Sequence, residues 1–132
     1  MANTPFLAGE TGLGPLDSRY VNPDDLPWKP TPSEGIEMKI LMQDQVSGLL
    51  TALFRWQPGA VLARHEHVEI EQTWVLEGSI VDEEGEALAG AYVWRPKGNQ
   101  HQARSPNGAL VISFFLKPNK FLDGDLAGTS LE

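Results

Sequence analysis

The chain has 132 residues, a length that suits one domain and leaves little room for a second hydrophobic core. Hydrophobic residues make up 41 % of it, as in globular proteins, and its net charge of −8 makes nucleic acids and anionic membrane surfaces unexpected partners. Cysteine is absent, which excludes disulfides, thiolate catalysis and cysteine-ligated zinc and fits a cytoplasmic location.

Residues 1–35 are the first predicted segment, an irregular N-terminal arm with one short strand. Prolines at positions 5, 15, 23, 27, 30 and 32 leave few places for a continuous backbone ladder. The start of the arm has neither the basic nor the apolar region of a signal peptide, so no targeting or membrane segment is expected there. Because the arm carries several apolar residues and no core of its own, we expect it to cross onto a partner subunit in a homodimer.

Residues 36–118 change to short β-prone runs separated by turn signals, and residues 119–132 follow as a tail. The runs are MKILM, GLLTALFRW, TWVLEGSIV, AYVWRP and GALVISFFL, with the turn signals QPG, DEEGE, PKGN and SPNG between them. Runs of this length and spacing indicate an all-β fold, an antiparallel sandwich or barrel. No window has a helical period long enough to compete.

Two of the three histidines of the chain, His65 and His67, lie one residue apart in the stretch HEHVEIEQTWVLEG. Because a strand points alternate side chains to one face, both imidazoles are expected on the same side, in the barrel interior. If the chain turns after His67 and Glu71 begins the next strand, Glu71 and His101 complete the site, with Glu69 as the substitute for Glu71. Three nitrogens and one oxygen suit iron, manganese, nickel, copper or zinc, and the lack of sulfur disfavours a finger-type zinc site. On a six-coordinate ion, two adjacent positions then remain open for water, oxygen or substrate.

At these residues the sequence resembles the cupin superfamily. Its first motif, G-x5-H-x-H-x3,4-E-x6-G, is matched from Gly59 through His65, His67 and Glu71 to Gly78. Its second motif, G-x5-P-x-G-x2-H-x3-N, is matched by Gly90, Pro96, Gly98 and His101, with Ser105 in place of the final asparagine. The resemblance implies a jelly-roll barrel over about residues 36–118, with the three histidines and Glu71 as ligands of one metal ion. The motif glycines are expected to allow turns and positive φ.

Finer features, among them LPWKP, GAYVWRPKGNQHQARSPNG and the closing FFLKP, resemble the ChrR-type cupins. That group includes acetylacetone and 2,4'-dihydroxyacetophenone dioxygenases. The resemblance implies a mononuclear divalent ion, iron(II) first and manganese, nickel or zinc as alternatives. It also implies an O2-dependent cleavage of a C–C bond beside a carbonyl in a small diketone or aryl ketone. Some relatives use three histidines without the glutamate, so the presence of Glu71 favours the aryl ketone subtype.

Two of the four tryptophans, Trp56 and Trp94, are the candidates for the wall of an aromatic substrate pocket. The competing role for large aromatics is in a core or a dimer interface. Arg64 lies beside the first ligand and is a candidate anchor for an anionic substrate, but strand alternation points it away from the metal. We therefore expect it to pack between the sheets or to pair with an acid. Leu62 stands where the oxalate-degrading cupins that the chain also resembles carry an arginine, which argues against a small dicarboxylate substrate.

Two further functions stay open beside the dioxygenase. ChrR itself is an anti-sigma factor, so a metal-dependent sensor or regulatory module is the first alternative. In that protein a separate zinc-binding helical domain holds the sigma factor, whereas this sequence has no cysteine and no predicted helical N-terminal domain. The second alternative is a cupin isomerase or a sugar-binding protein, because a fold does not fix a function. Substrate turnover, as opposed to ligand binding alone, separates these hypotheses.

Overall fold

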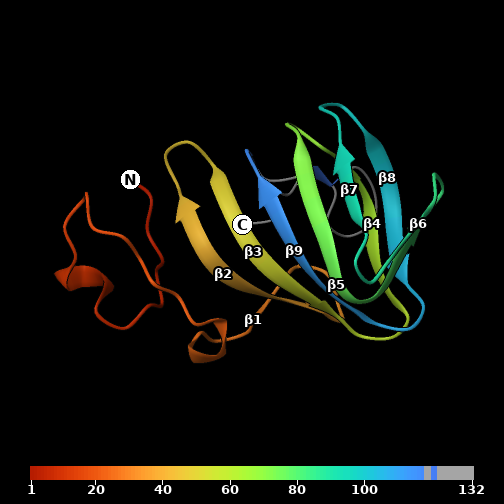
Figure 1. Ribbon diagram of the computed structural model, residues 1–132. Helices are drawn as coiled ribbons and strands as arrows, with labels where there is room; N and C mark the ends of the chain where they lie inside the picture. Colours follow the sequence, from red (N-terminus) through yellow and green to blue (C-terminus); the bar gives the residue numbers. More distant parts are fainter. Residues whose placement is uncertain (118–119, 122–132) are drawn as a thin grey trace.

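The computed structural model describes residues 1–117 and 120–121. The helical segments are the short 3₁₀ helices η1 (Glu10–Gly12) and η2 (Pro23–Asp25). The strands are β1 (Lys29–Pro30), β2 (Ile36–Asp44), β3 (Leu49–Trp56), β4 (Ala60–Glu66), β5 (Glu71–Asp82), β6 (Glu86–Leu88), β7 (Tyr92–Arg95), β8 (Gln100–Ser105), β9 (Ala109–Phe115) and β10 (Lys120–Phe121). The predicted all-β fold is confirmed: the strands form a curled antiparallel sheet that closes around a common interior (Figure 1).

The strand order explains how the barrel closes. Along the sheet the order is β1-β2-β3-β9-β5-β8-β4-β10, with β6 and β7 also paired to β5. The first half of β5 pairs with β7 and β9, and its second half pairs with β6 and β8. The two walls of the barrel therefore share this one long strand.

A β-bulge in β5 changes which of its side chains face the interior. The register of β5 against β9 shifts between Val75 and Glu77. Before the shift the odd-numbered Glu71, Thr73 and Val75 line the interior cavity, and after it the even-numbered Ile80 does. The odd-numbered Ser79 is also buried but does not line this cavity. An extra residue at a bulge has this effect because side chains alternate strictly along a regular strand.

Just beyond the bulge, Gly78 allows a very close passage of two chain segments. Its φ is +73°, and a Cβ at this position would lie 1.9 Å from the carbonyl oxygen of Gly108. No side chain fits there without moving the backbone. Gly59, Gly90 and Gly98 also have positive φ, which confirms the turn role predicted for the motif glycines.

Apolar side chains from both walls fill the interior, with Ala52, Val75, Val111 and Phe115 among the most buried. The rings of Phe54 and Phe115 meet edge to face with their centroids 6.0 Å apart. This core lies against the site described below, so it fixes one wall of that site.

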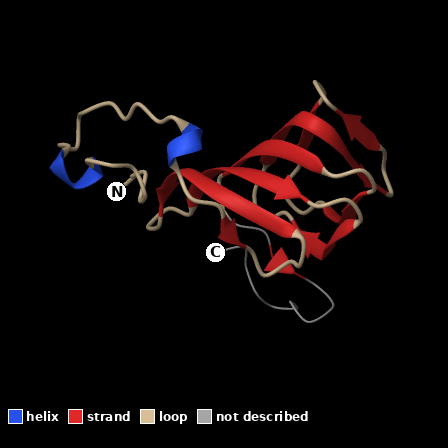
Figure 2. Ribbon diagram, turned by 90° about the horizontal axis from the view of Figure 1, so that it is seen from below, coloured by secondary structure: helices blue, strands red, loops and turns tan. Residues whose placement is uncertain are grey.

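The N-terminal arm lies beside β2, at the side of the barrel (Figures 1 and 2). Its one short strand, β1, pairs with β2, and Asn3 and Gln43 exchange two backbone hydrogen bonds of 2.8 Å. The crossing of the arm onto a partner subunit stays a prediction. No helix among the described residues has the length and hydropathy needed to cross a bilayer.

The segment predicted as a C-terminal tail, residues 119–132, contains a short strand among its described residues. Lys120–Phe121 form β10, which pairs with β4 so that Phe121 lies opposite His65. The barrel pairing thus continues past the boundary predicted at residue 118. The rest of the predicted tail, residues 122–132, lies outside the described residues.

Candidate metal centre

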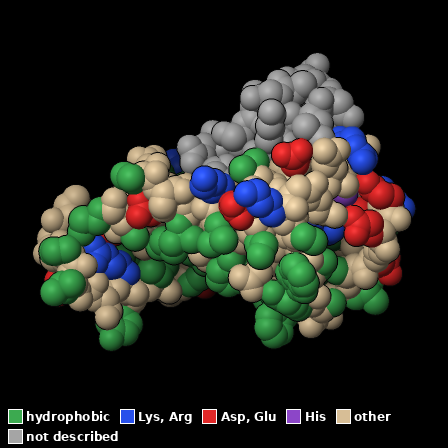
Figure 3. All heavy atoms as spheres, turned by 90° about the horizontal axis from the view of Figure 1, so that it is seen from above, with side chains coloured by type: hydrophobic (Ala, Val, Ile, Leu, Met, Phe, Trp, Pro, Cys, Tyr) green, Lys and Arg blue, Asp and Glu red, His purple; other side chains and the backbone are tan. Residues whose placement is uncertain are grey.

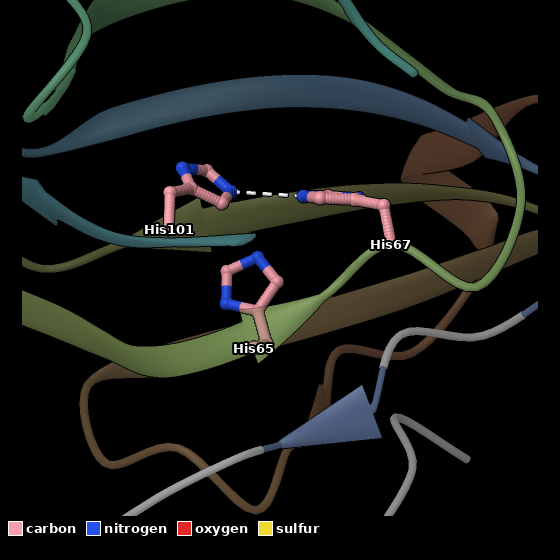
Figure 4. Close-up of side chains that lie close together, drawn as sticks. All are labelled: His65, His67 and His101. Carbon is pink, nitrogen blue, oxygen red and sulfur yellow. Dashed lines mark hydrogen bonds between the residues drawn. The ribbon is translucent and has the colours of Figure 1, made fainter. Parts of the chain in front are cut away.

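The structure brings the three histidines together inside the barrel (Figure 4). His65 comes from β4, His101 from β8, and His67 from the loop that follows β4. Each offers a ligand atom, and these atoms lie within 4.8 Å of one another. Their exposed fractions are 1 %, 0 % and 2 % for His65, His67 and His101, and only a sliver of histidine shows between charged side chains in Figure 3.

His65 and His101 meet because they are direct partners across the β4–β8 ladder. The register of this ladder shifts between Leu62 and His65. Because of this shift, the side chains of Leu62 and His65 both face the cavity. The side chain of Arg64 points away from the histidines and pairs with Glu83 at 3.1 Å. The pairing with an acid expected from the sequence is therefore present.

His67 lies just beyond the end of β4, so backbone contacts rather than strand alternation position it. Its N–H donates to the carbonyl of Asn99 at 2.8 Å, and its own carbonyl accepts from the N–H of Gly98 at 2.7 Å. These bonds join the loop of the first motif to the turn that precedes His101. The second motif thereby fixes the position of a histidine of the first.

Each imidazole has an oxygen atom close to its Nδ1. The pairs are His65 with the carbonyl of Ala63 at 2.8 Å, His101 with Asp82 Oδ2 at 2.9 Å, and His67 with Glu71 Oε2 at 2.8 Å. The last contact is short but not aligned as a hydrogen bond, and the buried His67 Nδ1 has no hydrogen-bond partner among the described residues. For His65 and His101 the acceptor beside Nδ1 assigns the proton to that nitrogen and the lone pair to Nε2. For His67 we make the same assignment, because a lone pair on Nδ1 would face the negative charge of Glu71 at 2.8 Å.

This arrangement fits a metal ion. His67 Nε2 and His101 Nε2 face each other at 2.9 Å in a buried site (Figure 4). Because the proton of each ring is assigned to Nδ1, the lone pairs of the two Nε2 atoms face each other and repel. A cation bound by both nitrogens would remove this repulsion. Metal–nitrogen bonds of about 2.1 Å at right angles place two ligand nitrogens about 3 Å apart, close to the separation seen here. Neutral imidazoles without sulfur suit a first-row transition metal.

Burial keeps the imidazoles of His65 and His101 in the uncharged form that a metal needs. Burial lowers the pKa of His65 to about 4, helped by the nearby charges of His67 and Arg95. Burial likewise lowers the pKa of His101 to about 4, followed by the positive charge of Arg95. Near neutral pH both rings therefore carry lone pairs that a proton does not occupy.

Glu71 begins β5, where the sequence placed it, and its side chain is buried. Its Oε1 accepts a hydrogen bond of 2.8 Å from the hydroxyl of Thr73, and its Oε2 faces His67. Burial alone would raise the pKa of Glu71, but the contacts with His67 and Thr73 hold it below its ordinary value. The cluster of ligand atoms within 4.8 Å contains the three histidines and not Glu71. Ligation by Glu71 stays a prediction, and the substitute Glu69 instead lies 3.3 Å from Lys97.

Two charged residues that the sequence did not single out, Asp82 and Arg95, complete the surroundings of the histidines. Asp82 Oδ2 contacts both His101 Nδ1 and, at 2.7 Å, Arg95 Nη1. The other oxygen of Asp82 accepts from the backbone N–H groups of Glu84 and Gly85. The turn DEEGE thus supplies the carboxylate that holds His101. For Arg95, the alternation of side chains in AYVWRP was the one sequence signal that it faces inward.

A cavity of about 60 Å³ lies beside the histidines. Its polar lining is Thr31, His65, Glu71, Thr73, Arg95, His101 and Ser113, and its apolar lining includes Phe54, Trp56, Leu62, Val75, Val111 and Phe115. Trp56, only 7 % exposed, is part of the wall. Trp94 is not: it is 56 % exposed and does not line this cavity, because alternation along β7 turns Val93 and Arg95 inward instead. The pocket role predicted for Trp94 is not supported by this placement.

Comparison with known proteins agrees with these motifs and this fold. A putative acetylacetone dioxygenase from Methylibium petroleiphilum PM1 shares 25 % identity over 90 % of each chain, with a TM-score of 0.78. An acetylacetone dioxygenase from Acinetobacter johnsonii has the same fold, at 23 % identity over 90 % of this chain and 88 % of that chain, with a TM-score of 0.77.

The anti-sigma ChrR, solved in complex with SigE from Rhodobacter sphaeroides, shares the fold more distantly. It has 20 % identity over 71 % of this chain and 50 % of that chain, with a TM-score of 0.61. No curated protein shows significant similarity to the chain. Residues 17–120 match the model of the ChrR cupin-like domain. The chain therefore belongs to the ChrR cupin-like domain family.

Proposed function

We propose that this protein is a metal-dependent dioxygenase that cleaves a C–C bond beside the carbonyl of a small ketone. The observation that carries the proposal is the convergence of three buried imidazoles beside a cavity lined mostly by apolar side chains. The similarity to a putative acetylacetone dioxygenase supports the reaction class. Iron(II) is the proposed ion, with manganese, nickel and zinc as the alternatives, and O2 is the proposed co-substrate.

In this proposal His65, His67 and His101 hold the ion, with Glu71 as the fourth ligand or as the acceptor that orients His67. When bound, the ion would supply a Lewis acid for an enolisable ketone and an electron donor toward O2. The apolar wall around Trp56 excludes water from the substrate. Asp82 keeps the proton of His101 on Nδ1, which leaves Nε2 free to bind metal.

The size of the cavity favours a small aliphatic ketone. One water needs roughly 10–15 Å³ of such space, so about 60 Å³ holds on the order of five water-sized groups. A β-diketone of a few carbons matches this volume better than an aryl ketone does. The cavity thus favours the smaller of the two substrate classes predicted from the sequence, whereas Glu71 favoured the larger.

The first test is O2 uptake by protein reconstituted with iron(II) under anaerobic conditions, against a panel of β-diketones and hydroxylated aryl ketones. We expect uptake with a small β-diketone and its loss in His101→Ala. Gln102→Ala is the matched control, because Gln102 is the exposed neighbour of His101 on β8. Absence of uptake across the panel, with iron demonstrably bound, would contradict the proposal and favour an isomerase or a sensor.

We also propose that the protein is a cytoplasmic homodimer that associates through the outer face of β5, β7 and β9. Four aromatic side chains on this face are 41–56 % exposed: Trp74, Tyr92, Trp94 and Phe114. Strand register places them side by side, with Trp74 opposite Tyr92 and with Gln72 between Trp94 and Phe114.

This aromatic face supplies part of the area that a stable interface needs. At about 150–250 Å² per aromatic residue, half exposure of four rings gives on the order of 400 Å² of apolar surface. That is as large as the main patches of monomers and about half of one side of a standard interface. Light scattering should show a dimer that Trp94→Glu dissociates, whereas Val46→Glu, on the exposed β2–β3 turn, should leave it intact. A monomeric wild-type protein would overturn this proposal.

A further inference from the structure

Arg95 is a buried cation that the proposed chemistry does not yet use. It is the last residue of β7, and alternation along that strand turns it into the barrel while Trp94 faces outward. Its partner across the ladder is Glu71, so the two side chains leave neighbouring strands on the same face. Both line the cavity together with His65 and His101. Arg95 therefore lies at the wall that a bound substrate would touch.

The position of the Arg95 guanidinium group is fixed by an ion pair with Asp82. Asp82 contacts Arg95 Nη1 at 2.7 Å and is itself held by the N–H groups of Glu84 and Gly85. A guanidinium carries five N–H donors, and Asp82 is the one ion-pair partner of Arg95 within the part of the chain that the structure describes. The other donors can therefore serve a ligand in the cavity. Arginine suits this task because its planar fork binds carboxylate-like oxygens in a defined orientation.

The charges around the histidines favour a ligand with one negative charge. Glu71 and Asp82 contribute two negative charges and Arg95 contributes one positive charge, and imidazoles that hold a metal ion are neutral. A divalent ion in this setting leaves an excess of one positive charge. A monoanionic ligand would neutralise the site, whereas a neutral ketone would leave buried positive charge uncompensated.

We infer that Arg95 is a specificity-determining residue that binds an anionic oxygen of the substrate, and that the substrate is a ketone with a second, negatively charged oxygen nearby. This inference rests on the proposed function and narrows its substrate class. Two kinds of small ketone offer the required chemistry, the enolate of a β-diketone and the carboxylate of a β-keto acid. A ketone without the second oxygen lacks the group that Arg95 binds.

Equilibrium binding to protein loaded with zinc, which does not react with O2, tests the inference separately from turnover. The probes are acetylacetone, acetoacetate and 2-pentanone, followed by calorimetry and, for acetylacetone, by the ultraviolet band of its enolate. We expect wild-type protein to bind at least one of the two anionic probes at least tenfold more tightly than 2-pentanone. Which anionic probe binds more tightly identifies the source of the negative charge.

Arg95→Gln should weaken binding of the preferred anionic probe by about 10- to 100-fold and change binding of 2-pentanone by less than about twofold. Arg95→Lys keeps a cation beside Asp82 and should recover part of the loss, which guards against a variant that fails to fold. Arg64→Gln is the matched control, because Arg64 pairs with Glu83 outside the cavity. Zinc content is measured in every variant and should not change.

Two results would overturn the inference. One is equal binding of anionic and neutral probes by wild-type protein, and the other is unchanged discrimination in Arg95→Gln. The proposed function fails independently, if the iron-loaded protein consumes no O2 with any probe while the discrimination by Arg95 persists.

Discussion

The Nδ1 atom of His101 lies 2.9 Å from Oδ2 of Asp82, so the last residue of β5 holds a histidine of β8. Two strands that pair only briefly, at Val81 and Asp82, are joined by this contact beside the site. A carboxylate in this position fixes the orientation and the protonated nitrogen of a metal-binding imidazole. The same carboxylate holds Arg95, so one residue positions both His101 and a cation of the cavity.

Replacement of Asp82 should weaken metal binding without removing a ligand. We expect Asp82→Asn to lower metal affinity by about 10- to 100-fold, because His101 loses the charge that orients it. Competition with a chromogenic chelator measures the affinity. Glu83→Gln, which changes the exposed neighbouring carboxylate, should bind metal as the wild type does. An unchanged affinity in Asp82→Asn would show that the contact does not support the metal.

Glu71→Gln separates the two roles considered for Glu71. If the carboxylate orients His67, as the 2.8 Å contact indicates, we expect metal affinity to fall by about 10- to 100-fold. The loss should be smaller than in His65→Ala or His101→Ala, measured with the same chelator. A loss as complete as in those histidine variants would instead identify Glu71 as a direct ligand.

The stability of the metal-free protein should fall in mild acid. The pKa values of His65 and His101 are lowered from 6.5 to about 4, so between these limits the unfolded chain binds protons that the folded chain does not. The stabilisation is therefore complete above about pH 6.5 and is lost as the pH falls toward 4. Between pH 7 and pH 5 the loss should be on the order of 1–2 kcal/mol per histidine.

Urea unfolding of chelator-treated protein at the two pH values measures this loss. A double variant with asparagine at positions 65 and 101 should show a flatter pH profile, since it lacks both titrating groups. Equal stability of the wild type at pH 7 and pH 5 would contradict the lowered pKa values.

Gly78→Ala should destabilise the barrel strongly. The new Cβ would collide with the backbone of Gly108, and alanine is strained at a φ of +73°. We expect a loss of about 3 kcal/mol or more in the free energy of unfolding, or no folded protein. Gly85→Ala is the control, because a Cβ at Gly85 would meet open space within 4 Å and should change stability little. Similar stabilities of the two variants would show that the backbone at Gly78 can adjust.

The sequence predicted the apolar strands better than the polar ones. The runs MKILM, GLLTALFRW, TWVLEGSIV and GALVISFFL fall within or largely overlap β2, β3, β5 and β9. The strand β8 was missed because its inward residues His101, Ala103 and Ser105 are polar or small, so QHQARS has no apolar stripe. Its alternation becomes visible only once His101 is assigned to the interior.

The histidines of the site could be predicted from spacing, whereas the residues around them could not. Motif spacing depends on local turns, which a sequence encodes directly, and it identified all three. Asp82 and Arg95 meet only because β5 and β7 place them on facing sides of the interior. Several other acids lie close to Asp82 in sequence, and nothing in the local pattern distinguishes the one that reaches His101.

The bulge between Val75 and Glu77 reverses which positions of β5, odd or even, point into the barrel. Glu71, which faces His67, lies before it, and Asp82, which holds His101, lies after it. The separation of eleven positions would put these two carboxylates on opposite faces of a regular strand. Deletion of one residue at the bulge would therefore leave every ligand in place in the sequence and yet turn Asp82 out to solvent, taking with it the anchor of Arg95. All of the site residues would still be present after such a deletion. The histidines would nevertheless keep only one of their two carboxylate partners, Glu71.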